Sequence, residues 1–274
     1  MMNARKIPAC GWVRSAGPAE TERNDHRMPA RKAKVLAVTS GKGGVGKSTL
    51  TVSLGIAAAA SGSRVLLIEL DAGLRGLDIM LGISGVVYDL GDLLEGRCNI
   101  SSAIIPSPNV SGLYAIVAPV SMTGPILIQD MRLLLDGLRA YFDLIILDTP
   151  AGLGRGLRIT CEVADLALII ATPDPVCIRD GNQVVREMLS RGFTSHRLII
   201  NRVNRKFIRR QVVQDLDEVI DGVGSQLIGV VPEDGEVTLF SSHGRLPDPK
   251  GELQRVCRAI IARLGGEYQP LIVR

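Results

Sequence analysis

Short apolar runs alternate with helix-like stretches along most of this chain. The runs are built mainly from Val, Ile, Leu and Ala, a composition typical of strands buried on both faces. They cover residues 34–40, 64–68, 113–117, 142–147, 166–171, 197–200 and 227–231. The alternation predicts βαβ units. We therefore expect an α/β fold with one domain, in which helices cover both faces of a mostly parallel twisted sheet.

The first 33 residues differ from the rest of the chain in charge and in pattern. Residues 1–34 hold eight Lys/Arg against three Asp/Glu, and the remainder holds 24 against 25, so the formal net charge of +4 comes from the leader. Without a continuous apolar core, the leader is not a secretory signal. We expect residues 1–33 to be a disordered basic leader and residues 34–274 to form the domain. Met28 resembles a natural start, which predicts that residues 1–27 are a start-site artefact.

Residues 41–48 read GKGGVGKS and satisfy the phosphate-binding pattern G-x-x-x-x-G-K-[ST]. An apolar run precedes them, and an Ala-rich, helix-like stretch over residues 48–60 follows. In such a loop the backbone N–H groups converge on one anion at a helix N-terminus. This context favours phosphate binding over a chance glycine-rich turn. We expect Lys47 to contact the β- and γ-phosphates and the Ser48 hydroxyl to ligate Mg²⁺.

Lysine is rare in this chain, which has 25 arginines and seven lysines. Only Lys42, Lys47, Lys206 and Lys250 lie beyond residue 34, and two of these four are in the phosphate loop. An ammonium is a compact charge on a flexible stem, suited to reaching a phosphate oxygen through a narrow glycine-walled opening. Lys42, the additional lysine of the loop, therefore narrows the range of phosphate-binding proteins that this loop can indicate.

Three acidic residues follow two of the predicted strands. Glu69 and Asp71 end the second apolar run, and Asp148 ends the run over residues 142–147. In an open parallel sheet ligands bind at the carboxyl ends of the strands. There the carboxylates can hold Mg²⁺ through water or orient an attacking water, although any one of them alone is more often solvated or a helix cap. Together they favour a nucleotide site.

Composition excludes several other classes. The five cysteines are widely spaced without a C-x-x-C pair, which argues against a zinc site or a disulfide framework and fits a reducing cytosol. No run of 18 apolar residues is present. Outside the leader the charge is nearly balanced, so there is no general nucleic-acid signal.

Taken together, these residues resemble the MinD/ParA family of deviant-Walker ATPases, and within it the MinD branch. The similarity covers about residues 34–270. Residues 71–90 separate the chain from ParA partition proteins, and further matches lie at 148–152, 172–173, 179–180, 201–202 and 231–234. The resemblance implies a P-loop NTPase that binds ATP and Mg²⁺, forms an ATP-dependent homodimer and acts as a Mg²⁺-dependent ATPase.

The resemblance also implies a role for each matching residue. Lys42 corresponds to the signature lysine that reaches the phosphates of the other subunit in an ATP-sandwich dimer. Asp71 corresponds to the switch I aspartate that positions the hydrolytic water, and Asp148 to the Walker B carboxylate. The implied catalytic residues are Lys42, Lys47, Asp71 and Asp148; the implied metal ligands are Ser48 directly and Asp71 and Asp148 through water. The implied nucleotide contacts are Gly41, Lys42, Gly43, Gly44, Val45, Gly46, Lys47, Ser48 and Thr49, then Pro150, Ala151 and Gly152 of switch II, which sense the γ-phosphate, and Asn201, Arg202 and Pro232 at the adenine.

The chain departs from the family pattern in three places. Glu69 replaces the usual aspartate, so we expect slow hydrolysis, and Ser48 replaces the commoner threonine. The chain also stops about where the family's basic amphipathic membrane helix begins. The helix predicted over residues 252–264 has an apolar stripe that fits docking on a sheet better than lying in a membrane. We expect this protein to bind membrane weakly or only through a partner.

The resemblance implies an ATP-driven switch that places the division septum or performs a related positioning task. It implies partners like MinC and MinE and a cytoplasmic location, with peripheral attachment to the inner face of the membrane left open. Two alternatives stay open. One is a ParA-type DNA partition ATPase, which a cluster of basic residues supports: Arg202, Arg205, Lys206, Arg209 and Arg210. We nevertheless do not expect nucleic-acid binding. The other is a nucleotide-binding regulator with little hydrolysis. A small-molecule kinase or amide ligase lacks a recognisable acceptor site.

Overall fold

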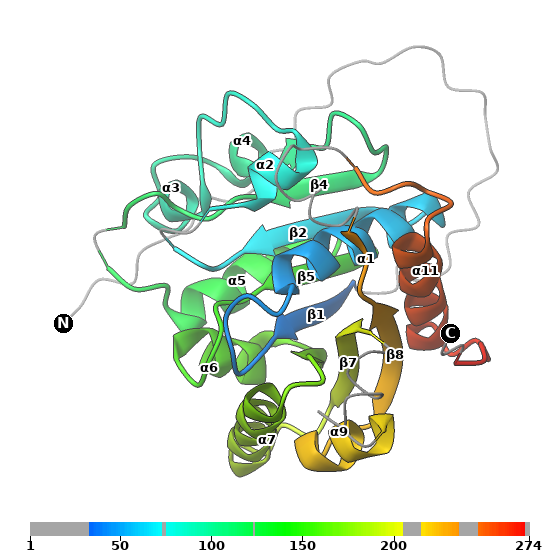
Figure 1. Cartoon of the computed structure of the whole chain (residues 1–274). Helices are drawn as coiled ribbons and strands as arrows, with labels where there is room; N and C mark the ends of the chain where they lie inside the picture. The colour runs from blue at the N-terminus through cyan, green and yellow to red at the C-terminus, as the bar shows by residue number, and fades with distance from the viewer. Residues whose placement is uncertain (1–32, 73–74, 123, 205–214, 236–245, 272–274) are drawn as a thin grey trace.

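A computed structural model of the chain describes residues 33–72, 75–122, 124–204, 215–235 and 246–271. Within these ranges eight strands form one sheet in the order β3-β4-β2-β5-β1-β6-β7-β8 (Figure 1). All neighbouring pairs are parallel except β3 with β4. Because seven strands run the same way, their carboxyl ends meet at one edge of the sheet.

The elements alternate along the chain as βαβ units require. The strands are β1 Lys34–Thr39, β2 Val65–Glu69, β3 Ile105–Pro106, β4 Leu113–Ile116, β5 Leu144–Asp148, β6 Leu166–Ala171, β7 His196–Val203 and β8 Leu227–Pro232. The helices are α1 Lys47–Ala60, α2 Leu77–Leu81, α3 Leu90–Leu94, α4 Ile100–Ala103, α5 Ile128–Leu138, α6 Arg155–Val163, α7 Pro175–Ser190, α9 Leu216–Val223 and α11 Glu252–Leu264.

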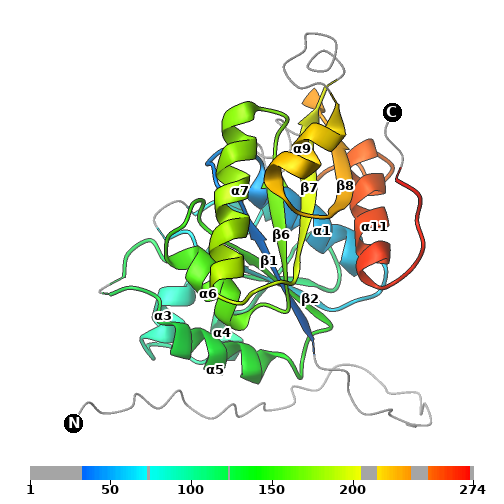
Figure 2. The same ribbon diagram turned by 90° about the horizontal axis from the view of Figure 1, so that it is seen from below.

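On the central strands β1, β2 and β5, successive side chains alternate between two clusters of buried apolar residues, which lie on opposite faces of these strands. On β1, Val35 and Ala37 belong to one core and Leu36 and Val38 to the other. Helices α1 and α11 pack together on one face, whereas α5, α6 and α7 lie on the opposite side (Figure 2). Both faces are therefore covered, which explains why these strands are apolar at every position.

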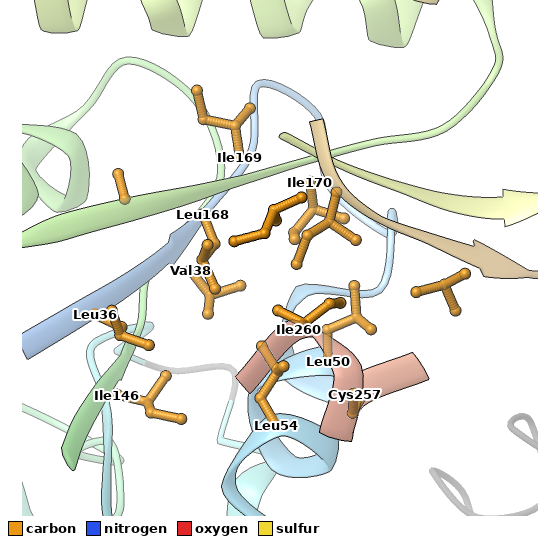
Figure 3. Packing of buried hydrophobic residues seen from close by; sticks show 14 of the residues in the cluster. Leu36, Val38, Leu50, Leu54, Ile146, Leu168, Ile169, Ile170, Cys257 and Ile260 are labelled. Carbon is orange, nitrogen blue, oxygen red and sulfur yellow. The ribbon is translucent and has the colours of Figure 1, made fainter. Parts of the chain in front are cut away.

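Helix α1 is held tightly between the sheet and α11. Its Leu50 and Leu54 lie with Ile260 of α11 and with Val38 of β1 (Figure 3). Gly229 on β8 allows the close approach of α11, because a Cβ there would lie 2.5 Å from Ile260 Cδ1. The helix that begins at the phosphate loop is thus fixed along its length by packing.

The structure confirms the predicted fold class. A single α/β domain contains a mostly parallel sheet with helices on both faces, and each predicted strand is present with bounds within three residues of the apolar run. The prediction missed β3, whose two residues, Ile105–Pro106, pair antiparallel with β4 and are too short to form an apolar run. Helix α11 packs on α1 and β8, which confirms that it is a core helix. In the described part of the chain, no helix is both long enough and apolar enough to cross a membrane.

Several sequence predictions concern residues outside the described ranges. These are nearly all of the leader with the proposed start at Met28, the basic residues Arg205, Lys206, Arg209 and Arg210, and Gly73 and Leu74 within the segment after β2. The division of the chain at residue 33 stays a prediction.

Candidate functional site

The phosphate loop lies between β1 and α1, at the carboxyl edge of the sheet. Its backbone is in the left-handed region at Gly44 (φ 76°) and Gly46 (φ 98°), which other residues rarely adopt. No atom lies within 4 Å of the position that a Cβ would take on Gly43 or Gly44. The loop thus offers a backbone-walled opening in front of the N-terminus of a 14-residue helix. This is the geometry of an anion-binding site.

Lys47 is the buried cation of the loop. Only 9% of its surface is exposed. Burial lowers the pKa of this lysine, while the negative charges of Asp148 and Asp71 oppose that effect. Both carboxylates therefore act electrostatically on one ammonium.

Asp148, at the end of β5, is 2% exposed and pairs in register with Val38 of β1 and Glu69 of β2. Burial raises its pKa to about 7, and hydrogen bonding from the Ser48 hydroxyl opposes the rise. The Thr51 hydroxyl donates a hydrogen bond of 3.3 Å to its Oδ1. A buried carboxylate beside a serine hydroxyl is a hard oxygen donor set, which suits Mg²⁺. These residues fit the predicted magnesium site.

The segment after Asp148 is tied to the phosphate loop by main-chain hydrogen bonds. Thr149 N–H donates to the carbonyl of Val38 at 3.2 Å, and Gly152 N–H donates to the carbonyl of Ser40 at 2.8 Å. Gly152 has φ 90°. The predicted switch II residues, Pro150, Ala151 and Gly152, consequently lie beside the start of the loop, in place to respond to its occupancy.

A pocket of about 600 Å³ lies next to the loop, between the ends of β7 and β8. It brings together the three predicted adenine contacts, Asn201, Arg202 and Pro232, with Gly46 and Thr49. Arg202 has φ 56°, a strained value for a residue with a side chain. Such strain is common at ligand-binding positions. The pocket adjoins the phosphate loop, which is where the base of a nucleotide bound to the loop would lie.

Lys42, the second lysine of the loop, has a different environment from Lys47. Its side chain is 47% exposed, and Nζ lies 3.5 Å from Oδ1 of Asp174. Asp174 caps α7, where its carboxylate also accepts a hydrogen bond of 3.0 Å from Cys177 N–H. One lysine of the loop therefore turns into the site and the other stays at the surface of the subunit.

Glu69 differs from what its place after β2 predicts. It is 1% exposed, and its carboxylate accepts main-chain N–H groups from Gly76, Leu77 and Ala118. Burial raises its pKa, and these three hydrogen bonds oppose the rise. Both oxygens accept main-chain hydrogen bonds, and the negative charge of Glu69 also helps to raise the pKa of Asp148 beside it.

The comparison with known protein families agrees with the phosphate-loop geometry. Residues 36–247 match the model of the CobQ/CobB/MinD/ParA nucleotide binding domain. The chain belongs to the MinD/ParA family of nucleotide-binding P-loop ATPases. As a MinD/ParA ATPase, it is 32% identical over 246 residues to the septum site-determining protein MinD of Bacillus subtilis, covering 88% of this chain and 92% of the relative. MinD of Helicobacter pylori is 37% identical over 221 residues, covering 77% and 82% of the two chains.

Solved structures agree with this MinD/ParA assignment. The MinD cell division protein of Aquifex aeolicus has a TM-score of 0.79 at 33% identity, covering 88% of this chain and 100% of that one. The MinC:MinD complex from the same organism gives a TM-score of 0.80. MinD from Pyrococcus horikoshii, solved with Mg-ADP, has a TM-score of 0.75 at 23% identity over 85% of this chain and 96% of that chain, and its likeness shows the fold.

The site contains three interactions that the sequence analysis missed. These are the contact between Thr51 and Asp148, the pairing of Asp174 with Lys42, and the main-chain contacts of Glu69. Asp174 carried a usable signal, since an acidic residue directly before proline is typical of a helix start. The other two depend on distances across the sheet. Among the predicted nucleotide residues, all lie within the described ranges and at the same edge of the sheet.

Proposed function

We propose that this MinD/ParA ATPase is an ATP-hydrolysing dimerisation switch of the MinD type, which acts in placing the division septum or in a related positioning task. The MinD relatives at 32% and 37% identity support this proposal. The structure of a MinC:MinD complex from a relative at 33% identity supports protein partners like MinC and MinE. We place the protein in the cytoplasm, where ATP and such partners are present.

The observation that carries the proposal is the opposite placement of the two loop lysines. Lys47 is buried beside Asp148 and Asp71, so it can serve the nucleotide of its own subunit. Lys42 is half exposed, and its ammonium forms a 3.5 Å ion pair with the carboxylate of Asp174. Exposed pairs of this kind contribute about 0–1 kcal/mol, so the ammonium can leave Asp174 at small cost. Lys42 is therefore free to reach the phosphates bound to a second subunit.

The chain's own residues suit ATP hydrolysis with Mg²⁺. The loop backbone, Lys47 and Thr49 bind the phosphates, and Asn201, Arg202 and Pro232 hold the base. Ser48, with Asp148 and Asp71 through water, would hold Mg²⁺, which neutralises charge on the phosphates when bound. Asp71 orients the attacking water. Positioning accounts for most of this chemistry, so we expect slow turnover that a protein partner stimulates.

The switch segments contact the γ-phosphate of bound ATP, and hydrolysis removes that contact. Pro150, Ala151 and Gly152 lie against the loop through the Gly152–Ser40 hydrogen bond, so a change in loop occupancy is transmitted directly to them. Release of these segments opens the dimer. This is an order–disorder switch driven by one phosphate.

The test measures molecular mass and phosphate release in purified protein with Mg²⁺ and ATP. We expect a dimer with ATP, a monomer with ADP, and slow phosphate release. Lys42→Ala should bind ATP normally, remain monomeric and lose hydrolysis. Lys250→Ala, which removes an exposed lysine away from the loop, should behave like the unchanged protein.

Unchanged turnover in Lys42→Ala would refute the sandwich model. Two further assays separate the alternatives. A salt-dependent DNA gel shift that requires ATP would favour a partition ATPase. ATP binding without phosphate release, even with a partner added, would favour a regulator that hydrolyses little.

A further inference from the structure

The carboxylate of Glu69 closes the loop that carries Asp71. Its Oε1 accepts hydrogen bonds from the N–H groups of Gly76 (2.7 Å) and Leu77 (3.2 Å), at the start of α2. The loop begins where Leu70 N–H donates to the main-chain carbonyl of Asp148 at 2.9 Å. The segment from residue 70 to residue 76 is therefore held at both ends, once by β5 and once by the Glu69 side chain.

The second oxygen of Glu69 holds another segment. Oε2 accepts a hydrogen bond of 3.0 Å from Ala118 N–H, directly after β4. Its neighbour Val117 accepts a hydrogen bond of 3.0 Å from Leu90 N–H, at the start of α3. One buried side chain thus joins the Asp71 loop, the end of β4 and, through β4, the segment before α3.

These contacts bind both carboxylate oxygens of Glu69 to the main chain. Three donors occupy its two oxygens, and only 1% of the residue is exposed. A buried carboxylate that accepts several main-chain N–H groups is strongly held, and its loss leaves those donors without an acceptor. Two of the donors, Gly76 and Leu77, lie at the start of α2, and the third, Ala118, follows β4.

We propose that Glu69 is a positioning residue for hydrolysis: it fastens Gly76 and Leu77 to β2 and so helps to fix the neighbouring Asp71 at the phosphate edge. This inference rests on the proposed ATPase function, because Asp71 is the group through which Glu69 acts. Among the described residues, the hydrogen bonds of the Glu69 carboxylate go to main-chain N–H groups outside the phosphate loop, so its role is separate from ATP binding.

The test compares Glu69→Ala and Glu69→Gln in the full chain by steady-state phosphate release. Misplacement of a catalytic group by about 1 Å can lower a rate about 100-fold. We expect Glu69→Ala to lower kcat about 10- to 100-fold while KM for ATP changes less than about threefold. Glu69→Gln keeps the length and one acceptor oxygen, so it should recover part of kcat. If Glu69→Ala does not fold, Glu69→Gln carries the same comparison.

A second readout follows the amides and does not depend on activity. Hydrogen exchange at Gly76, Leu77 and Ala118 should speed up in Glu69→Ala, and in Glu69→Gln at the amides that lose their acceptor oxygen, with the amides of α1 unchanged. Asp215→Ala is the control, since Asp215 also accepts a main-chain N–H, from Glu218 at 2.9 Å, but at the start of α9. It should lower the melting temperature and leave kcat and KM as they were.

Unchanged kcat in Glu69→Ala, or a fall in kcat matched by Asp215→Ala at equal loss of melting temperature, would overturn the positioning role. So would unchanged exchange at the three amides. Absence of phosphate release from the unsubstituted protein would instead refute the proposed ATPase function, and the exchange measurement would still test the contacts of Glu69.

Discussion

The side-chain amide of Asn201, on β7, donates a hydrogen bond of 2.7 Å to the main-chain carbonyl of Val45 in the phosphate loop. The two residues are 156 positions apart in the chain. Asn201 also approaches Gly46 so closely that a Cβ there would lie 2.4 Å from its Nδ2. The loop is therefore shaped by β7 as well as by its own glycines, and the base pocket and the phosphate site share a wall.

Asn201→Ala should weaken ATP binding about tenfold. It removes the donor to Val45, and an unmade buried hydrogen bond costs about 1–3 kcal/mol. Titration calorimetry with Mg²⁺-nucleotide measures the change. Asn182→Ala is the matched control, because Asn182 donates a similar bond of 3.3 Å to the Val223 carbonyl, away from the site. Equal affinities in the two variants would contradict the role of Asn201.

Gly41→Ala should destabilise the protein, whereas Gly43→Ala, in the same loop, should not. A Cβ on Gly41 would lie 2.4 Å from the carbonyl carbon and oxygen of Asp180, which are backbone atoms of α7 and cannot move easily. A Cβ on Gly43 meets no atom within 4 Å. Overpacking of this kind costs about 1–3 kcal/mol. Urea unfolding of the nucleotide-free proteins provides the measurement, and equal midpoints would show that Gly41 has no steric role.

Binding of Mg²⁺-nucleotide should release a proton near pH 6 and almost none at pH 8.5. Burial raises the pKa of Asp148 to about 7, so the carboxyl is mostly protonated at pH 6 in the nucleotide-free protein, and a magnesium ligand must be ionised. Affinity should fall by up to about tenfold for each pH unit below 7. Calorimetry in two buffers of different ionisation enthalpy counts the protons.

ADP without Mg²⁺ is the control for that experiment and should release fewer protons.

The raised pKa of Asp148 also has a consequence for folding. Because the folded pKa of Asp148 lies above its ordinary value of 3.8, the stability of the nucleotide-free protein should fall as the pH rises from about 4 to about 7. Proton uptake on binding, or stability that rises over this range, would be inconsistent with a buried protonated Asp148.

Asp71→Ala should trap an ATP-bound dimer. The aspartate is proposed to orient the attacking water, whereas the phosphates and the base are held by other residues, so binding persists when hydrolysis stops. Light scattering with ATP should report a dimer that does not return to monomer over the time in which the unsubstituted protein does. Asp78→Asn, which alters the 2.8 Å ion pair between Arg75 and Asp78 of α2, serves as a nearby control. Detection of monomer alone in Asp71→Ala with ATP would count against this role.

Local pattern was enough to predict most of the fold. Strands such as β6 and helices such as α11 were predicted with the bounds that the structure has, because a continuous apolar run and a helical stripe each reflect burial that is set along the chain itself. Local pattern does not predict the order of the strands in the sheet. It also does not predict β3, since a two-residue strand has no period to detect.

Sequence alone determined the phosphate loop, its two lysines, the acids at the strand ends and the family. These are contiguous motifs, whose chemistry follows from residue type and spacing. Tertiary structure decided what each group faces: it buried Lys47 between carboxylates, left Lys42 at the surface beside Asp174, tied Asn201 to Val45 and turned Glu69 onto the main chain. Those outcomes depend on which segments the parallel sheet brings together at its carboxyl edge. Local sequence pattern does not reveal that residues 49 or 156 positions apart lie next to each other.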